Sequence, residues 1–316
     1  MRIAVLDRMA IGTDTPLDGL YELGDVIVYD TTSETELKER VTDADVLVFN
    51  KVKITEEIMS LGKKLKLLCV TATGYDNIDL CAAKKRGIAV CNVPGYSTDS
   101  VTLYTIAMVT SLLTHMREYN EYVRCGEYTR SGVPNRMSPV YHEIRGLTWG
   151  VIGYGGIGQS VAKVAEAFGA QVLVCKRTAI DSVRCVDIET LCRESDIITI
   201  HCPLNDATAD LINKKRISLM KPNVIIANLA RGAVVNDNDI ADAVLEGRIG
   251  GFASDVYMIE PLSIESPLQK IKHLDNVLLT PHAAWGAYEA RSRCITITCA
   301  NIKAYNDGKV LNRVDI

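Results

Sequence analysis

Short apolar runs alternate with longer segments of helical periodicity along almost the whole chain. In the first hundred residues the apolar runs lie at 3–6, 26–29, 46–49, 65–71 and 88–92. A second series lies at 147–152, 172–174, 197–201, 224–228, 250–254 and 277–280. Near-continuous runs of Val, Ile and Leu separated by helices are typical of a parallel sheet covered on both faces. The pattern therefore predicts an α/β protein with two doubly wound parallel-sheet units.

The chain is expected to pass between these units twice. A turn at 94–100 offers several N-cap residues ahead of a helix-like segment at 101–117, and another helical pattern at 287–306 follows the last predicted strand. A length of 316 residues favours two domains over one core. Because the helical pattern at 287–306 lies after the last predicted strand of the second unit, we expect this helix to return to the first unit. The predicted domains are 1–98 with 287–316, and 99–286, with a cleft between them.

A glycine-rich turn stands between the run at 147–152 and a helix-like run at 159–168. Its residues are Gly153, Tyr154, Gly155, Gly156, Ile157 and Gly158. Glycines let the backbone approach a pyrophosphate, whose charge then lies at the N–H groups of the following helix. An ordinary strand-to-helix turn is the alternative, but strand, glycines and helix occur in the order that a dinucleotide site requires. The turn therefore predicts a Rossmann nucleotide-binding domain.

Composition narrows the other possibilities. Hydrophobic residues make up 47% of the chain, charged residues 23%, and the net charge is −4, so a globular protein without a nucleic-acid partner is expected. The longest apolar stretch, 101–113, is too short to cross a bilayer, and the first residues lack the features of a signal peptide. The ten cysteines show no zinc-site spacing, so no metal is predicted. Their number without a secretion signal indicates reduced thiols in the cytoplasm.

Three polar residues each follow a predicted strand of the second unit. They are Arg231, Glu260 and His282. Taken singly, they read as a surface charge, a loop carboxylate and a structural histidine. In an open α/β sheet, however, the carboxyl ends of the strands face the ligand crevice, so the three side chains are expected to converge on a nicotinamide. We therefore interpret them together as catalytic residues.

Several motifs in one order resemble the D-isomer-specific 2-hydroxyacid dehydrogenase family. They are the glycine turn, Asn228-Leu229-Ala230-Arg231-Gly232, Asp255-Val256 with Glu260-Pro261-Leu262, and Thr280-Pro281-His282. The resemblance covers essentially the whole chain. It implies a flavodoxin-like substrate domain beside the Rossmann domain, and a homodimer. Trp285 resembles the hydroxypyruvate and glyoxylate reductase branch, which includes glycerate dehydrogenases, so the resemblance implies reduction of a small 2-oxo acid to the (R)-2-hydroxy acid.

The resemblance also implies residue roles. Arg231 would hold the substrate carboxylate and carbonyl, His282 would exchange the proton with the substrate oxygen, and Glu260 would orient the imidazole. Thr73 and Gly74 lie in a stretch, 71–79, that resembles the carboxylate-binding loop of the family, and a simple turn is the alternative. Lys51 is a further candidate for substrate binding, although a solvated lysine is the more common case. Trp285 is the last candidate substrate contact. The residues implied to contact cofactor outside the glycine turn are Lys176, Arg177, Thr178, Pro203, Thr208, Ala230 and Asp255, with Asp255 receiving the nicotinamide carboxamide.

The chain departs from the usual NAD pattern after the second nucleotide-domain strand. An NAD site places Asp or Glu there, whereas this chain has Lys176 followed by Arg177. Because cations attract a 2′-phosphate, we expect NADP to be favoured over NAD, although both residues could be solvated loop charges. The alternatives are a lactate-type or bulkier 2-oxo acid with NADH and, in another class, a cofactor-sensing regulatory protein on the same fold.

Overall fold

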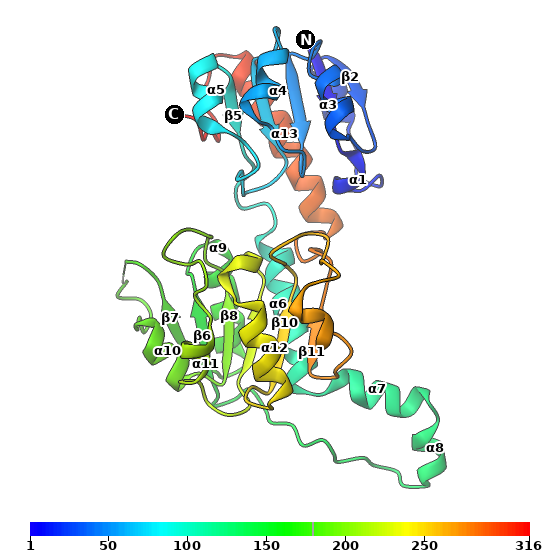
Figure 1. Cartoon of the computed structure of the whole chain (residues 1–316), viewed down its shortest axis with the longest axis vertical. Helices are drawn as coiled ribbons and strands as arrows, with labels where there is room; N and C mark the ends of the chain where they lie inside the picture. Colours follow the sequence, from blue (N-terminus) through cyan, green and yellow to red (C-terminus); the bar gives the residue numbers. More distant parts are fainter. Residues whose placement is uncertain (179) are drawn as a thin grey trace. The chain divides into compact units, whose positions relative to one another are not determined.

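The computed structural model describes residues 1–178 and 180–316. The chain divides into two compact units, each with its own parallel sheet and flanking helices (Figure 1). Unit 1 consists of Met1–Ser97 and Trp285–Ile316, and unit 2 of Thr98–Ala284. The prediction of two doubly wound parallel-sheet units is confirmed.

The sheet of unit 1 has the strand order β2-β1-β3-β4-β5, in which all pairs are parallel. This order is that of flavodoxin-like sheets. The strands are β1 (Arg2–Val5), β2 (Asp25–Val28), β3 (Val46–Phe49), β4 (Leu67–Val70) and β5 (Ala89–Cys91). The helices are α1 (Arg8–Ile11), α2 (Asp18–Tyr21), α3 (Glu34–Arg40), α4 (Glu56–Leu61), α5 (Leu80–Arg86) and α13 (Tyr288–Asn306).

Both faces of this sheet are buried, which explains its continuous apolar strands. Along β3, Leu47 and Phe49 belong to one hydrophobic cluster, and Val46 and Val48 belong to the cluster on the other face. Successive side chains of a strand point to opposite faces, so a strand buried on both sides cannot alternate apolar with polar residues. Helix α13 adds Ile295 and Ile302 to the second cluster, which ties the end of the chain to unit 1.

The described residues of unit 2 form a six-stranded parallel sheet in the order β11-β10-β9-β8-β6-β7. The strands are β6 (Thr148–Ile152), β7 (Gln171–Cys175), β8 (Ile197–Ile200), β9 (Ile225–Asn228), β10 (Gly251–Ser254) and β11 (Val277–Leu279). A single parallel bridge pairs Val174 with Cys185 beside β7. The order changes direction at β6, so the sheet has the switch point of a Rossmann fold at the strand that precedes the glycine turn.

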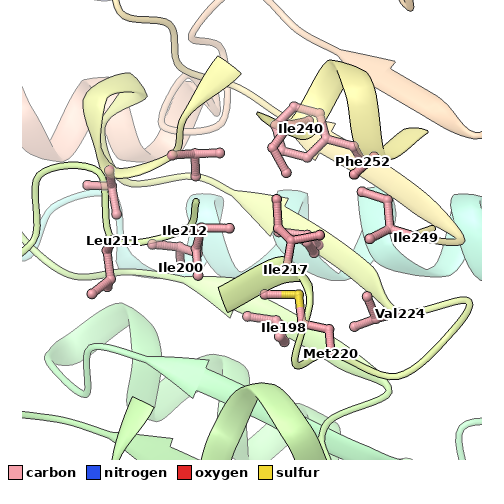
Figure 2. Close-up of a cluster of buried hydrophobic side chains, with 14 of the residues drawn as sticks. Ile198, Ile200, Leu211, Ile212, Ile217, Met220, Val224, Ile240, Ile249 and Phe252 are labelled. Carbon is pink, nitrogen blue, oxygen red and sulfur yellow. The ribbon is translucent and has the colours of Figure 1, made fainter. Parts of the chain in front are cut away.

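The helical elements of unit 2 flank this sheet or project from it. They are α6 (Thr98–Leu113), α7 (Met116–Arg124), α8 (Glu127–Ser131), α9 (Gly156–Ala167), α10 (Ile188–Glu194), α11 (Lys214–Ile217), η1 (Gly232–Val234), α12 (Asp237–Leu245) and η2 (Pro267–Lys270). Figure 2 shows the cluster between the sheet and its helices, in which Ile198 and Phe252 of the strands meet Ile217 and Ile240 of the helices.

Two predicted helix boundaries were wrong. The helical segment expected at 101–117 ends earlier, at Leu113, because His115 adopts a left-handed conformation (φ 51°) before α7 begins at Met116. Helix α6 buries Val101, Thr105 and Val109 and packs against α9, β9 and β10, so it belongs to the core of unit 2. Helix α9 begins at Gly156, inside the glycine turn, rather than at residue 159.

Candidate active site

The glycine turn fits a dinucleotide pyrophosphate. Gly153 has φ +89°, and a Cβ atom there would lie 2.6 Å from the backbone nitrogen of Cys202. A Cβ atom at Gly158 would lie 2.1 Å from the carbonyl oxygen of Gly153, whereas one at Gly155 would meet nothing within 4 Å. Gly155 is the N-cap of α9, and no side chain caps the helix there. The open face of the turn thus presents the positive end of a helix dipole to an approaching anion.

His201, which follows β8 beside this turn, is a feature that the sequence did not reveal. Both ring nitrogens are buried, and no described group lies within hydrogen-bond distance of either. Burial lowers the pKa of His201 to about 3, because the charged imidazolium is disfavoured away from water. The imidazole is therefore neutral at physiological pH. The signal in the sequence that could have singled out His201 was its position directly after a strand that lies beside the glycine turn.

The residues predicted to contact the ribose lie at the carboxyl end of β7. Lys176 is half-buried, and Arg177 and Thr178 are exposed. Among the described residues, no carboxylate lies within ion-pair distance of either cation. The loop after β8 carries two more predicted contacts: the Thr208 hydroxyl donates to the carbonyl oxygen of Pro203 at 2.6 Å, which fixes the shape of this loop.

The three predicted catalytic residues follow three neighbouring strands. Arg231 follows β9, Glu260 follows β10 and His282 follows β11, and these strands are adjacent in the sheet. The Nη1 atom of Arg231 donates to the carbonyl oxygen of Ala230 at 2.9 Å. A Cβ atom at Gly232 would lie 2.0 Å from the carbonyl carbon of Tyr257, so glycine lets the loop after β9 approach the loop after β10 closely. Parallel topology thus gathers the loops of all three residues at one edge.

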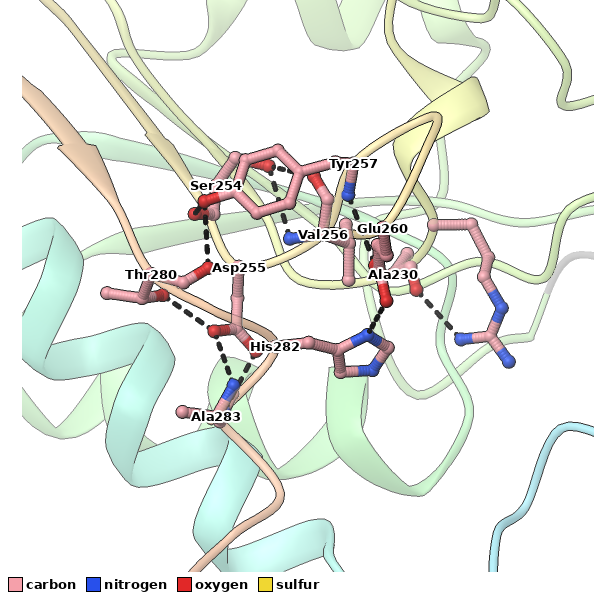
Figure 3. A network of polar contacts seen from close by, with 11 residues as sticks. Ala230, Ser254, Asp255, Val256, Tyr257, Glu260, Thr280, His282 and Ala283 are labelled. Carbon is pink, nitrogen blue, oxygen red and sulfur yellow. Dashed lines mark hydrogen bonds and ion pairs between the residues drawn. The ribbon is translucent and has the colours of Figure 1, made fainter. Parts of the chain in front are cut away.

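His282 and Glu260 form a direct pair (Figure 3). Nδ1 of His282 lies 2.7 Å from Oε2 of Glu260, and the two side chains are 26% and 30% exposed. Because an ionised carboxylate only accepts hydrogen bonds, the proton of this contact is on Nδ1 of His282. Oε1 of Glu260 accepts a hydrogen bond from the backbone N–H of Tyr257 at 3.2 Å. The pair is therefore oriented on its carboxylate side as well.

Asp255, predicted to receive the nicotinamide carboxamide, is 2% exposed and engaged with the loop of His282. Its carboxylate accepts hydrogen bonds from the Thr280 hydroxyl and from the backbone N–H groups of Ala283 and Ala284. The Tyr257 hydroxyl donates to the carbonyl oxygen of Thr280 at 2.8 Å, and burial raises the pKa of Tyr257 to about 12. Tyr257 therefore stays a neutral donor at physiological pH.

The predicted substrate contacts Lys51, Thr73, Gly74 and Trp285 belong to unit 1. Lys51 is exposed after β3, the Thr73 hydroxyl donates to the carbonyl oxygen of Val93, and Trp285 packs edge-on against Tyr96 with ring centroids 6.1 Å apart. The part of these residues in substrate binding stays a prediction.

A buried carboxylate that sequence reasoning did not single out supports the Lys51 loop. Asp7, directly after β1, accepts hydrogen bonds from the backbone N–H groups of Asn50 and Lys51 at 2.7–3.0 Å. Burial raises the pKa of Asp7, and these N–H groups oppose that shift. The Asn77 amide donates to the carbonyl oxygens of Asn50 and Val52, which holds the same loop from its other side.

Residues 1–178 and 180–316 contain no group of three or more His, Cys, Asp or Glu side chains arranged to hold a metal ion. Within the same residues, every helix is too short or too polar to span a bilayer.

Comparison with known proteins identifies the family of the chain. Residues 106–284 match the model of the D-isomer specific 2-hydroxyacid dehydrogenase NAD binding domain. The hydroxypyruvate reductase of Blautia hydrogenotrophica is 35% identical over 324 aligned positions that cover 100% of both chains. The glyoxylate reductase of Thermococcus litoralis is 37% identical over 87% of this chain and 84% of its own. The chain belongs to the D-isomer specific 2-hydroxyacid dehydrogenase family.

A solved structure extends the likeness to the whole fold. An acyclic imino acid reductase in complex with NADPH and D-Arg superposes with a TM-score of 0.86. It is 30% identical in sequence, and the match covers 99% of this chain and 100% of that protein. The predicted enzyme family and its NAD(P)-binding domain are therefore confirmed.

Proposed function

We propose that the protein reduces a small 2-oxo acid, of the hydroxypyruvate and glyoxylate type, to the (R)-2-hydroxy acid with NAD(P)H. The observation that carries the proposal is the 2.7 Å contact between His282 Nδ1 and Glu260 Oε2, beside the loop of Arg231. Similar proteins named hydroxypyruvate reductase, glyoxylate reductase and glycerate dehydrogenase support the substrate class. This reaction needs a residue that can give and take a proton, such as histidine, and a cation that binds the substrate carboxylate.

The proposed mechanism assigns a task to each side chain. Arg231 holds the substrate carboxylate through its planar pair of N–H donors, and the carbonyl carbon is thereby oriented. The hydride to that carbon would come from a reduced nicotinamide bound in the domain that carries the glycine turn. His282 gives the Nε2 proton to the carbonyl oxygen as it becomes a hydroxyl, and Glu260 stabilises the imidazolium and fixes its tautomer. In the reverse direction Nε2 takes the hydroxyl proton.

We further propose that NADPH is the preferred cofactor. Lys176 and Arg177 stand at the end of β7, where an acidic residue would repel the 2′-phosphate. The complex of the similar imino acid reductase with NADPH supports this choice within the fold. A charge-assisted hydrogen bond contributes about 1.5–3 kcal/mol, so one such contact would give a preference of about ten- to a hundredfold.

The proposal is tested by initial rates with hydroxypyruvate, glyoxylate and pyruvate, each with NADPH and NADH at equal concentration. Faster turnover of hydroxypyruvate or glyoxylate than of pyruvate, with NADPH ahead of NADH, is expected. A preference for pyruvate with NADH would favour the lactate-type alternative. Cofactor binding without turnover of any substrate would contradict the proposed reaction and favour the regulatory alternative.

We also propose that the protein acts in the cytoplasm, where its ten free thiols stay reduced. A second proposal concerns its assembly: a second copy of the chain covers the segment formed by α7, α8 and residues 132–141. Neither helix of this segment has a buried residue, and both extend away from the sheet of unit 2 (Figure 1). Met137 and Val140 are 75% and 70% exposed. The Tyr119 hydroxyl donates to the carbonyl oxygen of Pro139, which links the stretch 132–141 to α7.

Large exposed apolar side chains on an ordered segment are typical of a subunit interface. Light scattering after size exclusion is expected to give twice the chain mass of 34.6 kDa. Replacing Met137 and Val140 together by Glu is expected to shift the mass toward the monomer, and an unchanged dimer would show that the interface lies elsewhere.

A further inference from the structure

The loop that carries His282 has an unusual backbone. His282 has φ +54°, in the left-handed region that few residues other than glycine adopt. Such a conformation persists only where the surrounding structure fixes it. The loop spans Thr280 to Ala284, directly after β11, and the residues that fix it come from the neighbouring strand β10.

The carboxylate of Asp255 accepts hydrogen bonds from residues on both sides of His282 in this loop (Figure 3). Oδ1 accepts hydrogen bonds from the Thr280 hydroxyl at 2.6 Å and from the Ala283 N–H at 2.8 Å. Oδ2 accepts one from the Ala284 N–H at 2.8 Å. One anchor thus precedes His282 and two follow it. A carboxylate can do this because both oxygens accept and neither donates.

The segment after β10 also holds the partner of His282. The N–H of Tyr257 donates to Oε1 of Glu260, while Oε2 of the same carboxylate accepts from His282. The Tyr257 hydroxyl adds a further hydrogen bond to the carbonyl oxygen of Thr280. Both members of the acid–base pair are therefore positioned by residues 255–257.

We propose that Asp255 is the positioning residue of the acid–base pair: it holds His282 in the left-handed conformation that directs Nδ1 to Glu260. The inference rests on the proposed function, because it gives that pair its geometry. It is separable from the predicted contact with the nicotinamide carboxamide. Three hydrogen bonds occupy three of about four acceptor positions of the carboxylate, so one position on Oδ2 remains for a ligand.

The informative variant is Asp255→Asn, because an amide keeps the shape but has one acceptor oxygen. The amide N–H₂ would then face backbone N–H donors, and the loop would relax. Asp196→Asn is the matched control. Asp196 accepts hydrogen bonds from the Thr148 N–H and from Lys221, and it lies at the amino ends of the strands of the same sheet. Tyr257→Phe is a milder second variant, which removes one hydrogen bond to the loop and keeps the ring.

The direct readout is NMR of the full-length protein labelled with ¹⁵N-histidine. The chain has five histidines, and the spectrum of His282→Ala assigns the signal of His282. In the wild type a downfield, slowly exchanging Nδ1 proton is expected for His282. Asp255→Asn is expected to lose it, Tyr257→Phe to shift it less, and Asp196→Asn to leave it unchanged. This readout needs no turnover, so its failure is distinct from failure of the proposed reaction.

Kinetics give the second readout. Asp255→Asn is expected to lower kcat for hydroxypyruvate by about a hundredfold, which is a typical cost of displacing a catalytic group by about 1 Å. The alkaline limb of the pH–rate profile should move to lower pH, which loss of a contact with the nicotinamide carboxamide alone would not cause. An unchanged histidine signal and pH profile in both Asp255→Asn and Tyr257→Phe would overturn the inference. With NADPH binding weakened in Asp255→Asn, that result would assign Asp255 to the carboxamide alone.

Discussion

Nδ1 of His282 lies 2.7 Å from Oε2 of Glu260, although the two residues are 22 positions apart and follow different strands. Strands β10 and β11 are parallel neighbours, so the loops after them meet at the carboxyl ends of the strands. In the proposed reaction, this contact makes the two loop residues an acid–base pair.

Glu260→Gln is expected to weaken catalysis without removing the acid–base group. An amide keeps a hydrogen bond to His282 but gives no charge to stabilise the imidazolium, so kcat should fall by about ten- to a hundredfold. The alkaline limb of the pH–rate profile for reduction should also move to lower pH. Glu265→Gln, an exposed carboxylate in the same connection, is the control. Identical profiles for Glu260→Gln and the wild type would show that Glu260 does not act on the proton donor.

Two glycines of the same turn are expected to respond to alanine in opposite ways. At Gly158 the new methyl would lie 2.1 Å from the Gly153 carbonyl oxygen, so the fold should lose about 1–3 kcal/mol and the melting temperature should fall by several degrees. At Gly155 the methyl meets no protein atom within 4 Å, so the melting temperature should stay the same. It would occupy the approach of the pyrophosphate, and NADPH affinity should fall at least about tenfold.

Thermal melts and NADPH fluorescence titrations of the two variants test this contrast. Unchanged NADPH affinity in Gly155→Ala would mean that the cofactor does not approach the turn from its open face. An unchanged melting temperature in Gly158→Ala would mean that the helix can shift away from the strand.

Lys176→Asp is expected to shift cofactor preference toward NADH, by about ten- to a few hundredfold in the ratio of kcat/KM values. The carboxylate removes an attraction for the 2′-phosphate and can accept hydrogen bonds from ribose hydroxyls. Lys163→Asp, an exposed lysine in α9, is the control for a change of net charge in the same unit. An equal ratio in Lys176→Asp and the wild type would show that Lys176 does not reach the ribose.

His201 is expected to make the protein sensitive to acid. Its pKa of about 3 in the folded state lies below the unfolded value of about 6.5, so only the unfolded state takes up this proton between those two values. The free energy of unfolding should therefore fall by about 1.4 kcal/mol per pH unit below pH 6.5 from this residue alone. Above pH 6.5 the imidazole is neutral in both states and the effect disappears.

Urea unfolding between pH 7 and pH 4.5 checks this, with His201→Phe as the test and the exposed His142→Phe as the control. The His201 variant should lose stability more slowly as the pH falls, while the control should follow the wild type. Parallel curves for all three proteins would contradict a buried, neutral His201.

The strands and the glycine turn could be predicted because their signals are local. Continuous apolar runs such as 46–49 report burial on both faces, and strand, glycines and helix occur together in sequence. The end of α6 before His115 could not be placed, because nothing in the residues from Thr110 to Met116 forbids a continuous helix. The helix start at Gly156 was missed because glycine is a weak helix former in general. In this turn, however, the backbone N–H groups of the glycines form the N-terminus of the helix.

The positions of the candidate site residues after neighbouring strands could be predicted, but their contacts could not. Strand ends marked Arg231, Glu260 and His282, yet the grip of Asp255 on residues 280–284 depends on the pairing of β10 with β11. The same holds for Asp7, whose partners Asn50 and Lys51 lie more than forty positions away. Long-range hydrogen bonds of this kind leave no periodic trace in a sequence.

The most direct test of the central claim compares the wild type with His282→Ala in the reduction of hydroxypyruvate by NADPH. Loss of general acid catalysis should lower kcat by about 10²–10⁴-fold while the dissociation constant of NADPH, measured by fluorescence, stays the same. Normal turnover by His282→Ala would contradict the account, because no other residue has been assigned to give the proton to the substrate oxygen.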